Sequence, residues 1–336
     1  MTRIYWVRHG ENWANLTKEF SHRKIDYSLT ARGRLQAEQT AAFFEGKEIA
    51  AVYSSPLKRA LQTAAPIAER LGLAVQVMEN FRELDVGTLE DHLPTPEDWT
   101  LHDSILGEWI IGDASRSLPG GEDYPTLWNR FSAGLRRVAL EQPGRASVIV
   151  AHGGNLFCTL HDLCPGEDVA RLRAQSNTNC AISELEVSFQ GEQPRAKVLQ
   201  WAFRGHLSGE ADQVVPGSPP RDPRRTPRLI YLSGPRQPTS AWLARLEREM
   251  GGQTGQNWAF LDSSLEDDLP LEEMTARAGS AEKWRWISAF RWVDRAAREF
   301  GASSGVVIAG QSKPEDVRQA ARLFQVADCE VFEVPE

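Results

Sequence analysis

The sequence contains few cysteines, and their spacing resembles neither a metal site nor a redox site. The cysteines are Cys158, Cys164, Cys180 and Cys329, and no two of them form a closely spaced pair. The seven histidines are scattered along the chain. We therefore expect reduced thiols in a cytoplasmic protein, with no metal site and no cofactor.

Long apolar runs and an excess of positive charge are also missing. No apolar run approaches the length of a transmembrane helix. Charged residues are already frequent among residues 1–20, which excludes the apolar region of a signal peptide. The formal net charge is −8, whereas general nucleic-acid binding requires a basic face. We expect neither a membrane nor a nucleic acid as a partner.

The length and the distribution of proline indicate two domains. The chain has 336 residues, of which 41% are hydrophobic, an ordinary share for a folded protein. Residues 208–227 are rich in proline and glycine and contain few apolar residues, as is typical of a linker. Strand and helix patterns alternate on both sides of it. We therefore predict an α/β domain over residues 1–207, a linker over 208–227 and a second, smaller α/β domain over 228–336.

Two short apolar segments each end in a histidine followed by glycine. Residues 3–7 read as a buried strand and lead into Arg8-His9-Gly10-Glu11. Residues 147–151 read as a second strand and lead into His152-Gly153-Gly154. Open α/β sheets place their ligands at the carboxyl ends of the strands. If the two strands are neighbours, the two histidines can meet over one pocket.

These residues suit phosphoryl transfer. An imidazole held in one tautomer can attack phosphorus, and arginines bind phosphate oxygens bidentately. A proton donor must also protonate the leaving oxygen. The chain supplies His9 as nucleophile, Arg8 and Arg59 as clamps, His152 as a second cationic donor and Glu83 as the acid. Taken singly, Arg59 is better interpreted as a solvated residue in the first turn of a helix, and Glu83 as an ion-pair partner of Arg82 or Arg59.

The order of several motifs changes that interpretation. Over residues 1–206 the chain carries, in sequence, Arg8-His9-Gly10-Glu11 with Asn15, the segment 26–37, the segment 52–64, Phe81-Arg82-Glu83-Leu84 with Gly87, Pro119-Gly120-Gly121-Glu122, and the segment 148–154. This set resembles the histidine phosphatase superfamily, the phosphoglycerate mutase-like group. The resemblance implies a three-layer α/β fold with a mostly parallel central sheet.

The resemblance also implies roles for individual residues. His9 would form a phosphohistidine, and Glu83 would be the proton donor. Arg8, Arg59 and His152 would complete the phosphate pocket, and Asn15, Ser21 and Gly153 would add further contacts to the phosphate. Ser54 and Ser55 are expected to shape a turn, and Thr30 to cap the helix that follows it.

The expected activity is that of a metal-independent phosphomonoesterase acting on a small phosphorylated metabolite. One alternative is a phosphomutase of the phosphoglycerate type, although residues 15–26 depart from the longer, Trp-containing stretch expected there. Another alternative is a non-catalytic phospho-ligand sensor with the C-terminal domain as its output. A sensor needs no proton donor, so the presence of Glu83 argues against it. The sequence does not identify the phosphoester.

Helices are expected over residues 35–44, 58–71 and 124–141, with a closing pair of strands over 181–187 and 197–203. Residues 91–118 appear irregular and aromatic, and we expect either a cap beside the pocket or a satellite core.

The second domain begins with a strand over residues 228–232 and a loop containing Gly234. The segment resembles a degenerate phosphate-binding loop of a nucleoside-monophosphate-kinase-like core. Thr239 and Ser240 stand where glycine and lysine are required, so nucleotide hydrolysis is not expected. We expect a packing or dimerisation domain instead. Its tryptophans, Trp284, Trp286 and Trp292, lie on different faces of one expected helix, and some of them are expected to face the first domain or another subunit, which leaves a homo-oligomer open.

Overall fold

The computed structural model divides into two compact units, Met1–Asn15 with Glu19–Gly217, and Leu16–Lys18 with Ser218–Glu336. It describes residues 1–92, 94–174, 178–212, 228–233, 257–262, 289, 292–293, 304–310, 312–323, 326 and 329–333.

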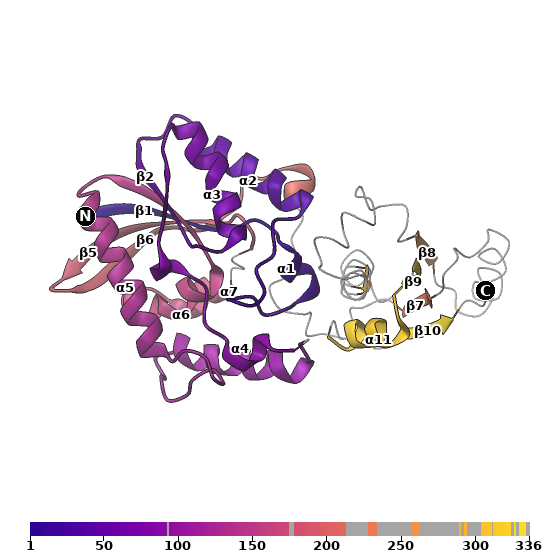
Figure 1. Cartoon of the computed structure of the whole chain (residues 1–336). Coiled ribbons are helices and arrows are strands. Elements are labelled where there is room, and N and C mark those ends of the chain that lie inside the picture. The colour runs from indigo at the N-terminus through magenta and orange to yellow at the C-terminus, as the bar shows by residue number, and fades with distance from the viewer. Residues whose placement is uncertain are drawn as a thin grey trace. The chain divides into compact units, whose positions relative to one another are not determined.

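The first unit is built on a six-stranded sheet with the order β3-β2-β4-β1-β5-β6 (Figure 1). The strands β1 to β4 run parallel, whereas β5 is antiparallel to β1 and β6 is antiparallel to β5. This confirms the mostly parallel sheet and the closing pair of strands, which the structure shows to be antiparallel. The strands are β1 Thr2–Arg8, β2 Ile49–Ser54, β3 Val75–Val77, β4 Ala146–Ala151, β5 Ile182–Gln190 and β6 Gln193–Phe203.

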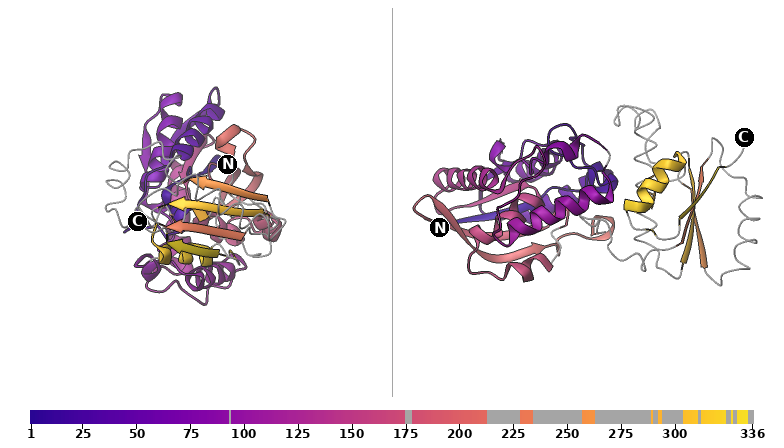
Figure 2. Two further views of the ribbon diagram at one scale, coloured as in Figure 1. Left: turned by 90° about the vertical axis from the view of Figure 1, so that its right-hand side faces the viewer. Right: turned by 90° about the horizontal axis from the view of Figure 1, so that it is seen from below.

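Helices cover both faces of this sheet, which gives three layers (Figure 2). The α-helices are α1 Trp13–Thr17, α2 Ala31–Phe44, α3 Lys58–Leu71, α4 Pro96–Ile110, α5 Tyr124–Glu141, α6 Gly153–Leu163 and α7 Val169–Ala174. The short 3-10 helices are η1 Glu79–Phe81, η2 Gly87–Glu90 and η3 Gly209–Asp212.

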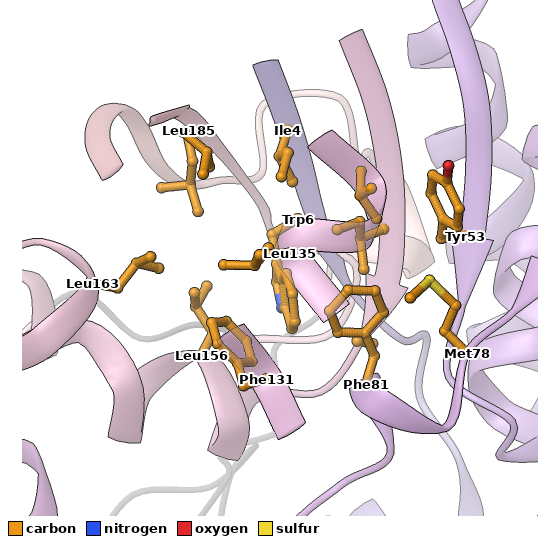
Figure 3. Close-up of a cluster of buried hydrophobic side chains, with 14 of the residues drawn as sticks. Ile4, Trp6, Tyr53, Met78, Phe81, Phe131, Leu135, Leu156, Leu163 and Leu185 are labelled. Carbon is orange, nitrogen blue, oxygen red and sulfur yellow. The ribbon is translucent and has the colours of Figure 1, made fainter. Parts of the chain in front are cut away.

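The alternation of side chains along β1 separates the two cores. Ile4 and Trp6 point into one core with residues of α5 and α6, and Trp6 packs edge-on against Phe81 with ring centroids 5.5 Å apart (Figure 3). Tyr5 and Val7 point to the other face, into the core that α2 and α3 cover. Because successive residues of a strand face opposite sides, a strand buried on both sides needs a continuous apolar run. The segment 4–7 has one.

Local signals set the helix boundaries that the sequence predicts. Thr30 accepts a hydrogen bond from the backbone N–H of Gly33 and so caps α2, as expected. Gly72 ends α3 in the left-handed conformation, with φ at 65°. Asp123 caps α5 by accepting from the N–H of Thr126.

The expectation of an irregular segment over residues 91–118 is wrong, because α4 occupies most of it. Thr95 and Asp98 form a capping box, and Pro96 stands at the helix start. Both are helix-initiation signals. Trp109 and Ile110 are buried in a cluster with Phe20, Leu84 and Tyr124, which is the satellite-core alternative. The aromatic residues of this segment therefore help to anchor the loops around the site.

The first unit continues past residue 207. Leu207 and Ala211 are buried together with Cys180, and the carbonyl of Ala211 accepts a hydrogen bond from Gln36 on α2. The segment 209–212 is thus attached to the helical layer of the first unit rather than forming an extended link. Residues 213–227, the remainder of the predicted linker, lie outside the described residues.

The second unit contains a four-stranded, all-parallel sheet with the order β10-β7-β9-β8. Its described elements are β7 Arg228–Ser233, β8 Asn257–Asp262, β9 Ser304–Gly310, α11 Pro314–Leu323 and β10 Cys329–Glu333. The strand predicted over residues 228–232 matches β7 to within one residue. The loop containing Gly234, Thr239 and Ser240, together with Trp284 and Trp286, lies outside the described residues, whereas Trp292 is buried. No helix among the described residues is long and apolar enough to cross a membrane.

Candidate active site

The carboxyl ends of β1 and β4 bring the two histidines together. The strands are parallel neighbours, with Arg8 in register with Ala151. The imidazole rings of His9 and His152 consequently lie with their centroids 5.3 Å apart. The expectation that two neighbouring strand ends place both histidines at one site is confirmed.

His9 is held in one tautomer. Its Nδ1 atom lies 2.7 Å from the carbonyl oxygen of Gly10, so Nδ1 carries the hydrogen and donates it. The lone pair is left on Nε2. Burial lowers the pKa of His9 well below its ordinary value, and the charges of Arg59 and Arg8 lower it further. A neutral imidazole with a free ring nitrogen is the nucleophilic form.

Two arginines supply positive charge beside His9. Arg59 is 3% exposed, so its interpretation as a solvated residue is wrong. Burial lowers the pKa of Arg59 to about 10 although Glu83 opposes the shift, and Arg59 stays a cation at neutral pH. Burial also lowers the pKa of Arg8, again with Glu83 opposing. Both groups can therefore pair with a dianionic phosphate without a metal ion.

His152 is fixed by Ser55, which the sequence predicts only to shape a turn. The Nε2 atom of His152 lies 2.7 Å from the hydroxyl of Ser55. The nearest acidic group to its Nδ1 atom is Glu83, at 3.8 Å, and Nδ1 has no hydrogen-bond partner among the described residues. Burial lowers the pKa of His152 well below its ordinary value, and Arg59 contributes. A buried, unsatisfied ring nitrogen at this position can contact a bound anion.

Glu83 reaches the same place from the loop after η1. Its Oε1 atom accepts the N–H of Leu84 at 3.0 Å, and its Oε2 atom faces His152. A Cβ atom on residue 154 would lie 2.8 Å from Oε1 of Glu83, so Gly154 permits the close approach. Arg82 does not pair with Glu83, because its guanidinium bonds Glu79 at 2.8 and 3.0 Å.

The three weaker candidates lie around this group. The hydroxyl of Ser21 accepts from Arg59 at 2.9 Å, and its carbonyl accepts from the same guanidinium at 3.0 Å, so Ser21 holds the arginine. Asn15 accepts an N–H bond from Asn179 through its side-chain oxygen at 3.0 Å. Gly153 begins α6, where the first backbone N–H groups have no intrahelical partner.

Several residues that shape the site carry no local signal in the sequence. Asn179, in the loop before β5, donates from Nδ2 to the backbone carbonyl of His9 at 3.0 Å. It thereby links that loop to the nucleophile. Ser55 orients His152, and His22 contacts the backbone of Glu83. Each is distant in sequence from the residue that it contacts, so only the fold could reveal the contact. Among the described residues no group of three or more histidine, cysteine or acidic side chains is arranged to hold a metal ion.

Comparisons with known proteins agree with this geometry. The family model of the histidine phosphatase superfamily, branch 1, matches residues 4–201. The chain is 31% identical to an uncharacterized phosphatase, PhoE, of Bacillus subtilis (strain 168), over 62% of this chain and 98% of that protein. It is 31% identical to a probable phosphoglycerate mutase, GpmB, of Serratia proteamaculans (strain 568), over 55% of this chain and 85% of that protein.

Solved structures resemble the first unit. A mycobacterial glucosyl-3-phosphoglycerate phosphatase, in a structure described as a complex with VO3, matches with a TM-score of 0.50 and 25% identity, over 59% of this chain and 98% of that one. A structure described as mycobacterial hydrolase 1 matches with a TM-score of 0.50 and 26% identity, over 60% of this chain and 97% of that one. The chain belongs to the histidine phosphatase superfamily, branch 1, and is an enzyme of the phosphatase type.

Proposed function

We propose that this protein hydrolyses a small phosphate monoester, without a metal ion, through a phosphohistidine on His9. The observation that carries the proposal is the state of His9, a neutral imidazole whose Nδ1 donates to the carbonyl of Gly10, whose Nε2 keeps the lone pair, and whose pKa is lowered by burial and by the charges of Arg59 and Arg8. A buried histidine with only a structural role would not need two buried guanidinium groups around it.

In the proposed reaction each of these side chains has one role. The Nε2 lone pair of His9 attacks phosphorus while the bond from phosphorus to the leaving oxygen breaks. Arg8, Arg59 and His152 surround the equatorial oxygens, whose charge must be stabilised. Glu83 acts as the general acid and gives a proton to the leaving oxygen. Water then attacks the phosphohistidine, Glu83 takes a proton from that water, and inorganic phosphate leaves.

The mutase alternative has its own support, because the relatives of about 31% identity include proteins named as probable phosphoglycerate mutases. Hydrolysis is favoured by the departure of residues 15–26 from the expected mutase stretch. A phosphoester panel, including phosphoglycerate and glycosylated phosphoglycerate esters, distinguishes the two. The purified protein should release phosphate in EDTA. A requirement for added 2,3-bisphosphoglycerate, with isomerisation and no release of phosphate, would establish the mutase.

For the second unit we propose a role in packing, assembly or substrate access rather than nucleotide hydrolysis. Its all-parallel sheet places β7 between β9 and β10, an arrangement compatible with a degenerate phosphate-binding core. The segment after β7 lacks the lysine that such a loop needs, and Pro235 and Pro238 remove backbone donors. Calorimetric titration with ATP and GTP tests this proposal. Tight binding that is lost in Arg236→Ala would make the protein bifunctional.

A further inference from the structure

His22 is a buried imidazole that the proposed reaction does not use. It lies in the loop between α1 and α2, and its side chain is 4% exposed. Its Nδ1 atom lies 2.9 Å from the backbone carbonyl oxygen of Glu83. Arg23 donates from Nε to the Nε2 atom of His22 at 3.0 Å. Because a guanidinium cannot accept a hydrogen bond, Nε2 must be the acceptor, and Nδ1 must carry the hydrogen that is donated to Glu83.

The carboxylate of Glu90 fixes this part of the loop. It accepts backbone N–H bonds from His22 at 2.6 Å, from Arg23 at 3.0 Å and from Ile25 at 2.9 Å. Glu90 is 6% exposed, and a buried carboxylate is costly unless donors of this kind satisfy it. The helix η2 that carries it starts at Gly87, with φ at 58°, where a Cβ atom would lie 2.2 Å from the carbonyl oxygen of Pro119.

The backbone around Glu83 is held from two sides. Arg130, on helix α5, donates hydrogen bonds to the backbone carbonyl of Arg82 at 2.7 Å and to that of Glu83 at 3.3 Å. His22 donates to the same Glu83 carbonyl at the shorter distance of 2.9 Å from the loop. The neighbouring residue of that loop, Ser21, holds Arg59. The loop that carries Ser21 and His22 therefore contacts both Arg59 and the backbone of Glu83.

We propose that His22 is a positioning residue for the proton donor Glu83, and that Glu90 keeps His22 in place. The inference rests on the proposed function. It assigns to His22 no contact with substrate. Its removal displaces the carboxyl group of Glu83 and so slows only the step that needs a proton on the leaving oxygen. Misplacement of a catalytic group by about 1 Å costs roughly a hundredfold in rate.

The test compares His22→Asn with His22→Gln on an alkyl phosphate and on para-nitrophenyl phosphate. Asparagine places its amide nitrogen at the position of Nδ1, whereas glutamine places it one bond further away. We expect His22→Asn to keep the ratio of alkyl to aryl kcat/KM within about threefold of the wild type. His22→Gln should lower that ratio about tenfold to a hundredfold. Retained turnover of the aryl ester reports an intact fold and phosphate pocket, and His92→Asn, at an exposed histidine, is the matched control.

A second comparison uses the Glu83→Gln protein as background. With the proton donor already removed, His22→Gln should cause no further loss on the alkyl phosphate. Equal losses on both substrates, equal behaviour of the Asn and Gln variants, or a full additional loss in the Glu83→Gln background would each overturn the inference. If the wild type itself forms no phosphohistidine on His9, the proposed function fails. If the phosphohistidine forms, and only Glu83→Gln slows the alkyl phosphate more than the aryl phosphate, the proposed function stands and only the role of His22 fails.

Discussion

The hydroxyl of Ser55 lies 2.7 Å from Nε2 of His152, and this contact joins the end of β2 to the end of β4. Ser55 also accepts the N–H of Leu57 at 3.3 Å, so it shapes the turn before α3 as expected. The same hydroxyl therefore fixes the backbone that leads to Arg59 and the ring orientation of His152. Two components of the proposed phosphate pocket depend on one serine.

Ser55→Ala should lower kcat/KM about tenfold, because His152 loses the contact that orients its ring, a positioning effect of the kind that costs up to about a hundredfold. Steady-state kinetics on para-nitrophenyl phosphate measures this change. Ser54→Ala is the matched control, since the hydroxyl of Ser54 is equally buried but bonds only the carbonyl of Ser55. An equal loss of rate in both variants would show that the turn, and not His152, is affected.

Glu83→Gln should slow the hydrolysis of an alkyl phosphate by roughly two to four powers of ten, the usual contribution of a general acid. The loss on para-nitrophenyl phosphate should be clearly smaller, because para-nitrophenolate leaves without protonation. Parallel measurement of kcat on the two esters checks the difference. Losses of the same size would indicate that Glu83 acts only through its charge or its packing.

The stability of the first unit should fall in mild acid, and His206 should contribute. Burial lowers the pKa of His206 to about 4, whereas an unfolded histidine has a pKa of about 6.5. As the pH falls below about 6.5, this histidine becomes protonated in the unfolded chain, whereas in the folded chain it becomes protonated only near pH 4. The free energy of unfolding therefore decreases as the pH falls through that window.

His206→Gln should flatten this dependence by up to about 1.4 kcal/mol per pH unit, the effect of one proton. Glutamine retains a donor for Thr40, whose hydroxyl lies 3.1 Å from Nε2 of His206. Urea unfolding at a series of pH values measures the slope, with His161→Gln, at an exposed histidine, as control. Identical slopes in the wild type and His206→Gln would contradict the assignment.

The sheet and the main site residues could be predicted from the sequence because their signals are local. Apolar runs ended by glycine mark β1 and β4, and parallel strands bring their carboxyl ends to one edge. Gly72 and Thr30 mark helix ends through their own backbone and side-chain chemistry. The helix α4 carries a local signal as well, the capping box of Thr95 and Asp98.

The supporting residues could not be predicted in the same way. Asn179, His22 and Glu90 act on atoms far away in sequence, and each is an ordinary polar residue in its own segment. Arg59 reads as solvated within its own segment, whereas in the structure its guanidinium bonds Ser21 of a loop distant in sequence. Contacts of this kind follow from loop geometry and not from periodicity, so the fold must be known before they can be identified.

The central claim is that phosphate passes through His9, and the most direct test locates the label. The protein is mixed with a labelled substrate, quenched in base, digested and mapped by mass spectrometry. We expect an acid-labile, base-stable phosphoryl group on the peptide containing His9, absent from a folded His9→Ala protein that no longer turns over substrate. A phosphoryl group on serine, or turnover that persists in His9→Ala, would contradict it.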